Sequence, residues 1–234
     1  MIGKLYLIPT TLGDENPLNV LPSTIKTIVS NISHFVVEDE RTARRFIKKL
    51  NPDTDIDKLQ FNELNKRTRF DEMNQFLDPI NEGQDIGIIS EAGCPGVADP
   101  GADLVRIAHQ KGIEVKPLVG PSSILLSLMA SGMNGQSFAF VGYIPVKHPA
   151  RGKTIRFLEH RAFQDDQTQI FIETPYRNNT LFDDLVKTLD EKTRLCIACD
   201  ITLETEFIKT RSIREWKKEK PDLHKKPAIF LIGK

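Results

Sequence analysis

The chain has 234 residues, which suffices for one large hydrophobic core or for two compact domains of ordinary size. Hydrophobic residues make up 39% of it and charged residues 27%, and no apolar run approaches the roughly 18 residues that a membrane span needs. The formal net charge is zero, so a general electrostatic attraction to nucleic acid is excluded, although local basic runs remain. The N-terminus shows no signal-peptide pattern, and we expect a soluble cytoplasmic protein without a membrane partner.

The cysteines and histidines show no metal-binding or disulfide pattern. Three cysteines are too few for a disulfide framework, as expected in a reducing compartment. Cys196 and Cys199 form a C-x-x-C, but they lie in an expected strand, where residues three apart point to opposite faces. The five histidines have no metal-ligand spacing, so we expect no metal site.

Strand and helix patterns alternate through the first half of the chain. This alternation predicts a mostly parallel sheet with helices on both faces. The expected strands are 4–8, 35–37, 59–61, 85–90 and 114–118, and the expected helices are 22–30, 42–50, 69–81 and 103–111.

The second half has a different order of elements. Strands follow one another from Leu195 to Lys209 without a helix between them, which predicts antiparallel pairing. The expected helices are 122–131, 151–160 and 178–189, and the expected strands are 138–141, 169–173, 194–201, 206–210 and 228–232. We therefore expect an α/β protein of two domains, 1–119 with a mostly parallel sheet and 120–234 with a mixed sheet, and a cleft between them.

The segment 90–101, Ser-Glu-Ala-Gly-Cys-Pro-Gly-Val-Ala-Asp-Pro-Gly, is the strongest candidate for a ligand site. It follows a short apolar strand and precedes a helix with Asp99 as the expected N-cap. Its glycines permit positive φ or close approach to a ligand. The loops 9–13 and 120–123 also follow hydrophobic strands, and ligands of open α/β sheets lie at such strand ends.

A second group of polar residues, Glu38, Asp39, Glu40 and Arg41, follows the strand 35–37. Carboxylates this close raise one another's pKa in a site or project into solvent, and their place at a strand end favours a site. The following helix carries a basic side that could contact phosphates or simply face solvent, formed by Arg41, Arg44, Arg45, Lys48 and Lys49.

Two common nucleotide signatures are absent. The chain contains neither G-x-x-x-x-G-K-[ST] nor G-x-G-x-x-G. Its loops are rich in Gly, Pro and Ser but poor in Lys, so they suit a neutral or zwitterionic ligand, held by backbone groups, better than a triphosphate.

The motifs taken together resemble those of the tetrapyrrole methylase superfamily. They are, in order, Leu-Tyr-Leu-Ile-Pro-Thr at 5–10, Glu-Asp-Glu-Arg at 38–41, the segment 90–101, Gly-Pro-Ser at 120–122 and Glu-Thr-Pro-Tyr-Arg at 173–177. Within that superfamily the chain is most similar to the branch that methylates a cytidine ribose 2′-OH in small-subunit ribosomal RNA. The likeness runs from about residue 4 to residue 232.

This resemblance implies an S-adenosylmethionine-dependent methyltransferase of two α/β domains, usually a homodimer, with the cofactor in the interdomain cleft. It places twelve residues around the cofactor: Pro9, Thr10, Glu91, Ala92, Gly93, Cys94, Pro95, Gly96, Gly120, Pro121, Ser122 and Ser123. Residues near 171–173 and 199–201 are expected to close over it. The branch usually has Asp at the position of Glu91, Thr at Cys94, Thr at Glu40 and Pro at Thr11, and it tends to show histidines around 61–66.

The resemblance leaves the methyl acceptor open. If the acceptor is a ribose hydroxyl, a base must take its proton, and Glu38 or Asp39 is the expected base or orienting group. Arg41 would then pair with these carboxylates or touch a phosphate. If the acceptor is an activated carbon of a tetrapyrrole-like ring, the same carboxylates would recognise the substrate. Three functions follow: a ribosomal RNA 2′-O-methyltransferase, a small-molecule methyltransferase, or a cofactor-binding protein without turnover.

Overall fold

The computed structural model describes residues 2–234, which divide into two compact units, one that ends at Ser122 (unit 1) and one that comprises Ser123–Lys234 (unit 2). The division lies between 122 and 123, whereas the sequence predicted it between 119 and 120. Within the described chain, no helix has the length and apolar character needed to cross a membrane.

Unit 1 contains a parallel sheet with the strand order β3-β2-β4-β1-β5. The strands are β1 (Leu5–Ile8), β2 (His34–Val37), β3 (Gln60–Glu63), β4 (Ile86–Ile89) and β5 (Val115–Pro117). Every neighbouring pair is parallel, so the carboxyl ends of all these strands lie at one edge of the sheet. The predicted parallel arrangement is confirmed, and its central strand β4 is buried along its whole length.

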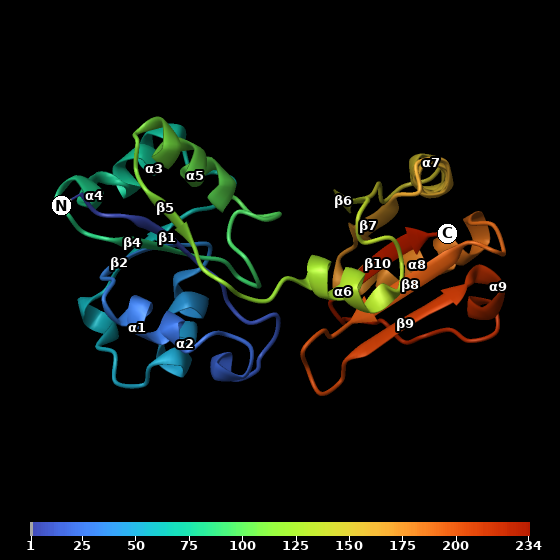
Figure 1. The fold of residues 1–234 in the computed structure, drawn as a ribbon, viewed down its shortest axis with the longest axis horizontal. Coiled ribbons are helices and arrows are strands. Elements are labelled where there is room, and N and C mark those ends of the chain that lie inside the picture. The colour runs from blue at the N-terminus through green and yellow to red at the C-terminus, as the bar shows by residue number, and fades with distance from the viewer. Residues whose placement is uncertain (1) are drawn as a thin grey trace. The chain divides into compact units, whose positions relative to one another are not determined.

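Helices cover both faces of this sheet, as Figure 1 shows. The side chains of Phe35 and Ile8 pack with helices α1 (Thr24–Ser30) and α2 (Glu40–Leu50) on one face. Leu5 and Val36 point to the other face, because side chains alternate along a strand. That face is covered by α3 (Phe70–Phe76), α4 (Asp78–Asn81) and α5 (Gly101–Gln110). Short 3-10 helices occupy Pro17–Asn19 (η1) and Ile56–Lys58 (η2).

The single helix expected over 69–81 is in fact two helices. α3 ends at the C-cap Leu77 and α4 begins at once, with Pro79 in its first turn. Proline lacks a backbone N–H and is tolerated only in the first turn of a helix, so the chain restarts a helix here rather than continuing one.

Unit 2 contains a mixed sheet with the strand order β6-β7-β10-β8-β9. The strands are β6 (Phe138–Tyr143), β7 (Thr168–Ile172), β8 (Arg194–Cys199), β9 (Phe207–Ser212) and β10 (Ala228–Gly233). β6 and β7 are parallel, while the pairs β7/β10, β10/β8 and β8/β9 are antiparallel. Both the mixed sheet and the antiparallel pairing of β8 with β9 agree with the prediction.

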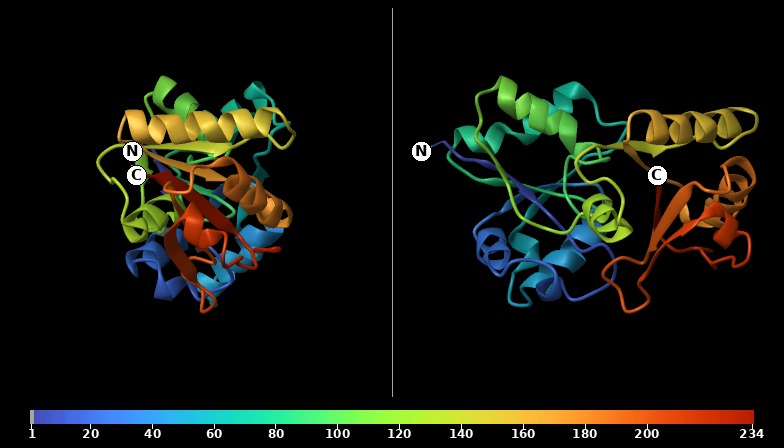
Figure 2. Two further views of the ribbon diagram at one scale, coloured as in Figure 1. Left: turned by 90° about the vertical axis from the view of Figure 1, so that its right-hand side faces the viewer. Right: turned by 45° about the vertical axis from the view of Figure 1, so that its right-hand side comes forward.

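The two faces of this sheet carry different helices. α6 (Ser123–Ser131) packs against β8, β9 and β10, and Ser131 accepts a hydrogen bond from Thr210 through its backbone oxygen (2.7 Å). The large core lies on the opposite face, under α7 (Ala150–Gln164), α8 (Asn178–Thr188) and α9 (Ile213–Trp216). Figure 2 shows α7 running beside the strands of unit 2. A 3-10 helix, η3 (Pro175–Arg177), precedes α8.

The elements expected from the sequence do not include helix α9, although a capping motif at its start marks the helix in the local sequence. Ser212 and Glu215 form a capping box in which each side chain binds the other's backbone N–H. Trp216 is buried at its end and donates a hydrogen bond from Nε1 to the oxygen of Leu195 (2.9 Å). The helix therefore closes one side of the unit 2 core.

Cys196 and Cys199 lie on β8 and are both buried. The side chain of Cys199 belongs to the core under α7 and α8, whereas that of Cys196 does not, as expected for residues three apart on a strand. Burial raises the pKa of both thiols, that of Cys199 to about 11.

Candidate active site

The loops that follow β1 and β4 are joined by hydrogen bonds at the carboxyl edge of the unit 1 sheet. The backbone N–H of Thr10 donates to the oxygen of Gly93 (2.9 Å), and the Thr10 hydroxyl donates to the oxygen of Ser90 (3.2 Å). The Ser90 hydroxyl also donates to Gly93 (2.9 Å). These hydrogen bonds are buried, and they hold the two loops to each other.

The loop that follows β5 packs against the other two. The Cys94 thiol donates to the backbone oxygens of Pro121 (3.4 Å) and Gly120 (3.8 Å). A Cβ atom at Gly120 would lie 2.3 Å from the ring of Pro9, so no larger residue fits there. Gly93 has a φ of +73°, a conformation that favours glycine. The three loops singled out in the sequence thus converge within unit 1.

The predicted cofactor residues differ in exposure. Glu91 and Ala92 are exposed, whereas Pro9, Thr10, Gly93 and Pro95 are buried. The others in unit 1 are half-buried, namely Cys94, Gly96, Gly120, Pro121 and Ser122. Ser123 begins α6 in unit 2.

Three carboxylates beside these loops have raised pKa values. Burial, and then the charge of Asp99, raises the pKa of Glu38. Burial, followed by the charges of Asp39 and Glu38, raises the pKa of Glu91, and burial raises that of Asp99. None of these three side chains forms an ion pair with another described residue. The positive charges that act on them, Lys66 on Glu38 and Arg45 on Glu91, only partly offset these effects.

Asp99 is not the N-cap of α5. The helix begins at Gly101 with Pro100 in the N-cap position. The Oδ1 atom of Asp99 instead accepts the backbone N–H groups of Gly96 (2.7 Å) and Gly101 (2.8 Å). The prediction was wrong because the carboxylate binds the backbone within the loop, at Gly96, as well as the first residue of the helix.

The three residues predicted to be catalytic have three different environments. Glu38 is half-buried and has no ion pair, as described above. Asp39 is the N-cap of α2, where its Oδ1 accepts the backbone N–H (2.8 Å) and the hydroxyl (2.9 Å) of Thr42. These hydrogen bonds lower the pKa of Asp39. Arg41 is exposed, and no hydrogen bond or ion pair joins its guanidinium to another residue of 2–234.

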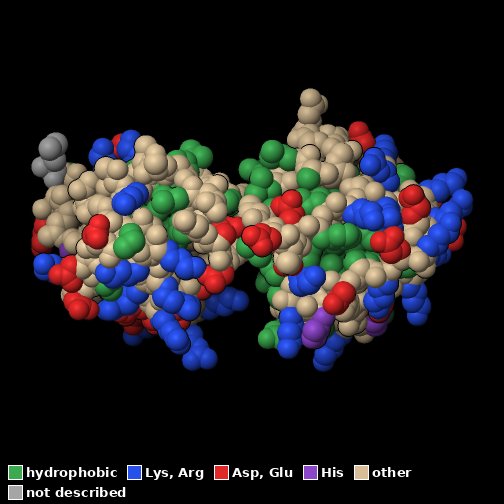
Figure 3. All heavy atoms as spheres, turned by 90° about the horizontal axis from the view of Figure 1, so that it is seen from below, with side chains coloured by type: hydrophobic (Ala, Val, Ile, Leu, Met, Phe, Trp, Pro, Cys, Tyr) green, Lys and Arg blue, Asp and Glu red, His purple; other side chains and the backbone are tan. Residues whose placement is uncertain are grey.

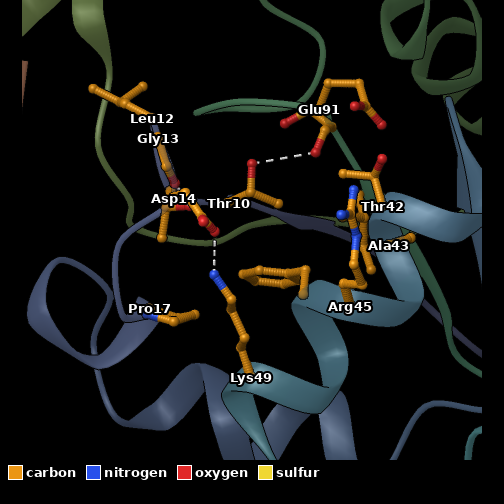
Figure 4. Close-up of a pocket in the computed structure, with 14 residues that line it drawn as sticks. Thr10, Leu12, Gly13, Asp14, Pro17, Thr42, Ala43, Arg45, Lys49 and Glu91 are labelled. Atoms are coloured by element: carbon orange, nitrogen blue, oxygen red, sulfur yellow. Dashed lines mark hydrogen bonds and ion pairs between the residues drawn. The ribbon is translucent and has the colours of Figure 1, made fainter. Parts of the chain in front are cut away.

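A cavity of about 460 Å³ lies entirely within unit 1, and its lining includes Glu91 and Thr42 but not Glu38, Asp39 or Arg41. One wall is the loop 10–14, a second is 89–91 at the end of β4, and the third is one side of α2 (Figure 4). Lys49 on α2 pairs with Asp14 across the cavity, and Arg45 and Thr42 lie along the helix wall. The sequence did not predict this pocket, because Asp14 and Lys49 meet only through the fold.

The motif at 173–177 forms a buried ion network in unit 2. Arg151 and Glu173 each have side chains only 1% exposed, and their closest atoms, Nη2 and Oε2, are 2.6 Å apart. Arg151 also donates to Asp184 (3.1 Å), and Arg177 donates to the other Glu173 oxygen (2.7 Å). Burial works to raise the pKa of Glu173, but the hydrogen bonds from Arg177 and Thr174 outweigh it and the pKa is lowered. Arg151 was not singled out in the sequence, and no local pattern marks it.

The residues expected to close over the cofactor from the second domain, 171–173 and 199–201, lie at the carboxyl ends of β7 and β8. Ile172 is half-buried, and the other residues of these two segments are buried. Over residues 2–234, no group of three or more His, Cys, Asp or Glu is arranged to hold a metal ion.

Comparison with known proteins identifies the family. The model of the tetrapyrrole (corrin/porphyrin) methylases matches residues 4–216. Two similar curated proteins carry the name ribosomal RNA small subunit methyltransferase I. The protein of Thermotoga maritima is 29% identical to this chain, and the match covers 94% of this chain and 95% of the relative. The protein of Buchnera aphidicola is 28% identical, and the match covers 98% of this chain and 78% of the relative.

Solved structures support the fold. The methyltransferase CobJ superposes with a TM-score of 0.64 at 17% identity, over 99% of this chain and 94% of its own. The cobalt precorrin-4 methyltransferase CbiF gives a TM-score of 0.61 at 16% identity, over 98% and 94% of the two chains. The two-unit α/β architecture, the converging loops and the family match lead to one conclusion. The chain belongs to the tetrapyrrole (corrin/porphyrin) methylase family and is an S-adenosylmethionine-dependent methyltransferase.

Proposed function

We propose that this protein transfers a methyl group from S-adenosylmethionine to a ribose 2′-hydroxyl of small-subunit ribosomal RNA. The observation that carries the proposal is the convergence of three loops beside Glu38, a half-buried carboxylate without an ion pair. The curated relatives, named as small-subunit ribosomal RNA methyltransferases, supply the class of substrate. The 2′-hydroxyl comes from the resemblance of the sequence motifs to that branch.

The residues present fit the cofactor. Gly120 lies against Pro9 without room for a side chain, and this close packing holds the first and third loops together. The negative charge of Glu91 in the second loop favours a nearby cation, and a sulfonium is such a cation. The cofactor, when bound, supplies an electrophilic methyl group. In this proposal the loop residues 9–10, 91–96 and 120–123 hold it.

Glu38 is the proposed general base. A base is most effective when its pKa approaches the working pH, and burial moves the pKa of Glu38 in that direction. Asp39 is less suited, because its carboxylate is already engaged as the cap of α2 and its pKa is lowered. Glu38 would accept the proton of the ribose hydroxyl as the oxygen attacks, and the remaining catalytic effect is alignment of the reactants.

The alternative acceptor, a small tetrapyrrole-like molecule, has weaker support. CobJ and CbiF share the fold with this chain at 17% and 16% identity, while curated relatives that match nearly the whole chain are ribosomal RNA methyltransferases. A cofactor-binding protein without turnover is not favoured, because a desolvated and unpaired carboxylate such as Glu38 is suited to accept a proton.

The test is methyl transfer in vitro. Radiolabelled S-adenosylmethionine is incubated with small ribosomal subunits from a strain that lacks the related methyltransferase, and with subunits from its parent as the control. We expect label in the RNA of the first sample only, at a nucleotide whose 3′ phosphodiester resists alkaline hydrolysis because its 2′-oxygen is methylated. Absence of label in both samples would reject the proposal, and label on a base would reject the ribose acceptor.

We also propose that the protein is a homodimer. Unit 2 carries several large apolar side chains at its surface, namely Phe138 (39% exposed), Tyr143 (65%), Phe157 (57%) and Phe163 (41%). Exposed apolar groups of this size commonly mark an interface. Sedimentation equilibrium should give twice the chain mass of 26.5 kDa, and a monomer at micromolar concentration would contradict the proposal.

A further inference from the structure

The cations of α2 fall into two groups. Three are engaged within the protein. Arg44 pairs with Glu40 (2.7 Å) and lies over the ring of Phe61, Lys49 pairs with Asp14, and Lys48 donates to the backbone oxygen of Pro52 (3.0 Å). Arg41 and Arg45 are exposed, and among the residues 2–234 no hydrogen bond or ion pair to their guanidinium groups is found.

These two arginines are one helical turn apart and therefore lie on one side of α2. Arg45 lines the cavity beside Thr42, and in Figure 4 its side chain extends from α2 along the wall that leads toward Glu91. Arg41 lies one turn nearer the start of the helix, close to the strand end that carries Glu38. Figure 3 shows Lys and Arg side chains gathered on the surface of unit 1 that α1 and α2 form.

The cavity beside the arginines has the size and chemistry for a single nucleoside. Ligand pockets typically measure about 300–1,000 Å³, and this one measures about 460 Å³. Leu12 and Phe46 provide apolar surface for a base, while Thr42 provides a hydroxyl group.

Electrostatics restrict how a nucleic-acid strand can lie here. Glu38 and Glu91 would repel phosphates at the sheet edge, and the chain as a whole has no net charge to attract RNA. Free guanidinium groups are good phosphate ligands, because each presents several donors in a plane. A strand with its phosphates on the α2 side could therefore direct a ribose hydroxyl toward Glu38.

We propose that Arg41 and Arg45 contact the phosphates of the acceptor RNA strand at the mouth of this pocket. This inference rests on the proposed function for the identity of the substrate. The phosphate contacts can be tested separately from methyl transfer, because they are measured by the salt dependence of RNA binding and not by turnover.

The experiment measures binding of a fluorescein-labelled, mixed-sequence single-stranded RNA by anisotropy over a series of salt concentrations. Arg41→Ala and Arg45→Ala are compared singly and together. For single strands, each phosphate contact adds about 0.7 to the steepness of the plot of log affinity against log salt concentration. We therefore expect the slope of the double variant to be shallower than that of wild type by about 1.4. Arg41→Lys/Arg45→Lys should recover most of the slope, because lysine retains the charge.

Arg106→Ala is the matched control. Arg106 is an exposed arginine on α5, which covers the opposite face of the same sheet, and within residues 2–234 its ion-pair partner is the exposed Asp103. Its removal should leave the slope unchanged. Circular dichroism and calorimetric titration with S-adenosylmethionine should give wild-type results for all variants.

The outcomes separate the two proposals. A wild-type slope in the double variant would overturn the phosphate contacts, even if the wild-type protein methylates ribosomal subunits. A reduced slope with a raised KM for small subunits and an unchanged kcat would support them. Failure of the wild-type protein to methylate subunits would instead reject the proposed function, and the slope would still decide whether the arginines bind phosphate.

Discussion

Glu38 in unit 1 and Glu173 in unit 2 have the same place in the fold and opposite environments. Each directly follows the last residue of a strand, β2 or β7. Glu173 is held by Arg151 and Arg177, and its pKa is lowered. Glu38 has no arginine partner, lies near Asp99, and has a raised pKa. The comparison shows that the partners, and not the position, decide whether the pKa of a carboxylate at a strand end is lowered or raised.

The largest expected effect is the loss of methyl transfer when Glu38 becomes Gln. General bases contribute about 10²–10⁴-fold to a rate, and Glu38→Gln should lower kcat within that range. Turnover is measured with labelled cofactor, and cofactor affinity by calorimetry. The affinity should stay within a few fold of wild type.

Asp39→Asn is the matched control for this substitution. Asparagine caps helices about as well as aspartate, so α2 should remain intact while the adjacent negative charge is removed. Equal loss of kcat in the two variants would contradict the assignment of the base to Glu38.

The second prediction concerns the paired carboxylate. Arg151→Met leaves Glu173 buried without one of its two arginine partners, and breaking a buried ion pair costs about 3–5 kcal/mol. Urea unfolding should show this loss in the free energy of unfolding. A loss below about 1 kcal/mol would mean that Arg177 alone satisfies Glu173.

The third prediction uses pH to separate the two glutamates. The pKa of Glu173 is below the usual 4.5, so its stabilising effect is complete above 4.5 and is lost as the pH falls through the lowered value. The pKa of Glu38 is above 4.5, so the base becomes protonated at a higher pH. On acidification, methyl transfer should therefore decline before unit 2 unfolds. Parallel activity and circular dichroism titrations test this order, and simultaneous loss would contradict it.

The smallest expected effect is at Cys94, which ties two loops of unit 1 by a weak donor. Cys94→Ala removes the hydrogen bonds to Pro121 and Gly120, and we expect cofactor affinity to fall by less than about tenfold. Cys94→Thr provides a stronger hydroxyl donor and should bind the cofactor at least as well as wild type. Calorimetric titration compares the two, and tighter binding by Cys94→Ala would show that the thiol does not support the loop.

The parts of the structure that depend on local pattern were predictable from the sequence. The short β-branched strands and the glycine-bearing loops after them indicated a parallel sheet with these loops together at its carboxyl edge, and the structure has both. Ligand binding at that edge stays a prediction. The capping box of α9, formed by Ser212 and Glu215, is an equally local signal for a helix that the expected elements do not include.

The parts that depend on distant partners were not predictable. No spacing in the sequence connects Arg151 with Glu173 and Asp184, since they come from α7, the end of β7 and α8. The pocket likewise requires Lys49 of α2 to meet Asp14 of the loop after β1. The carboxylates at 38 and 39 look alike in sequence, and only the hydrogen bonds of Asp39 to Thr42 distinguish them.

The double hydrogen bond of Asp99 has a consequence for ligand selection. Because one carboxylate oxygen binds the backbone N–H groups of both Gly96 and Gly101, the half of the loop between them loses little conformational freedom when a ligand binds. Preorganisation of this kind raises affinity for molecules that match the existing shape and penalises those that demand rearrangement. Close analogues of the cofactor should therefore be distinguished by steric fit, with little adaptation of the backbone to accommodate them.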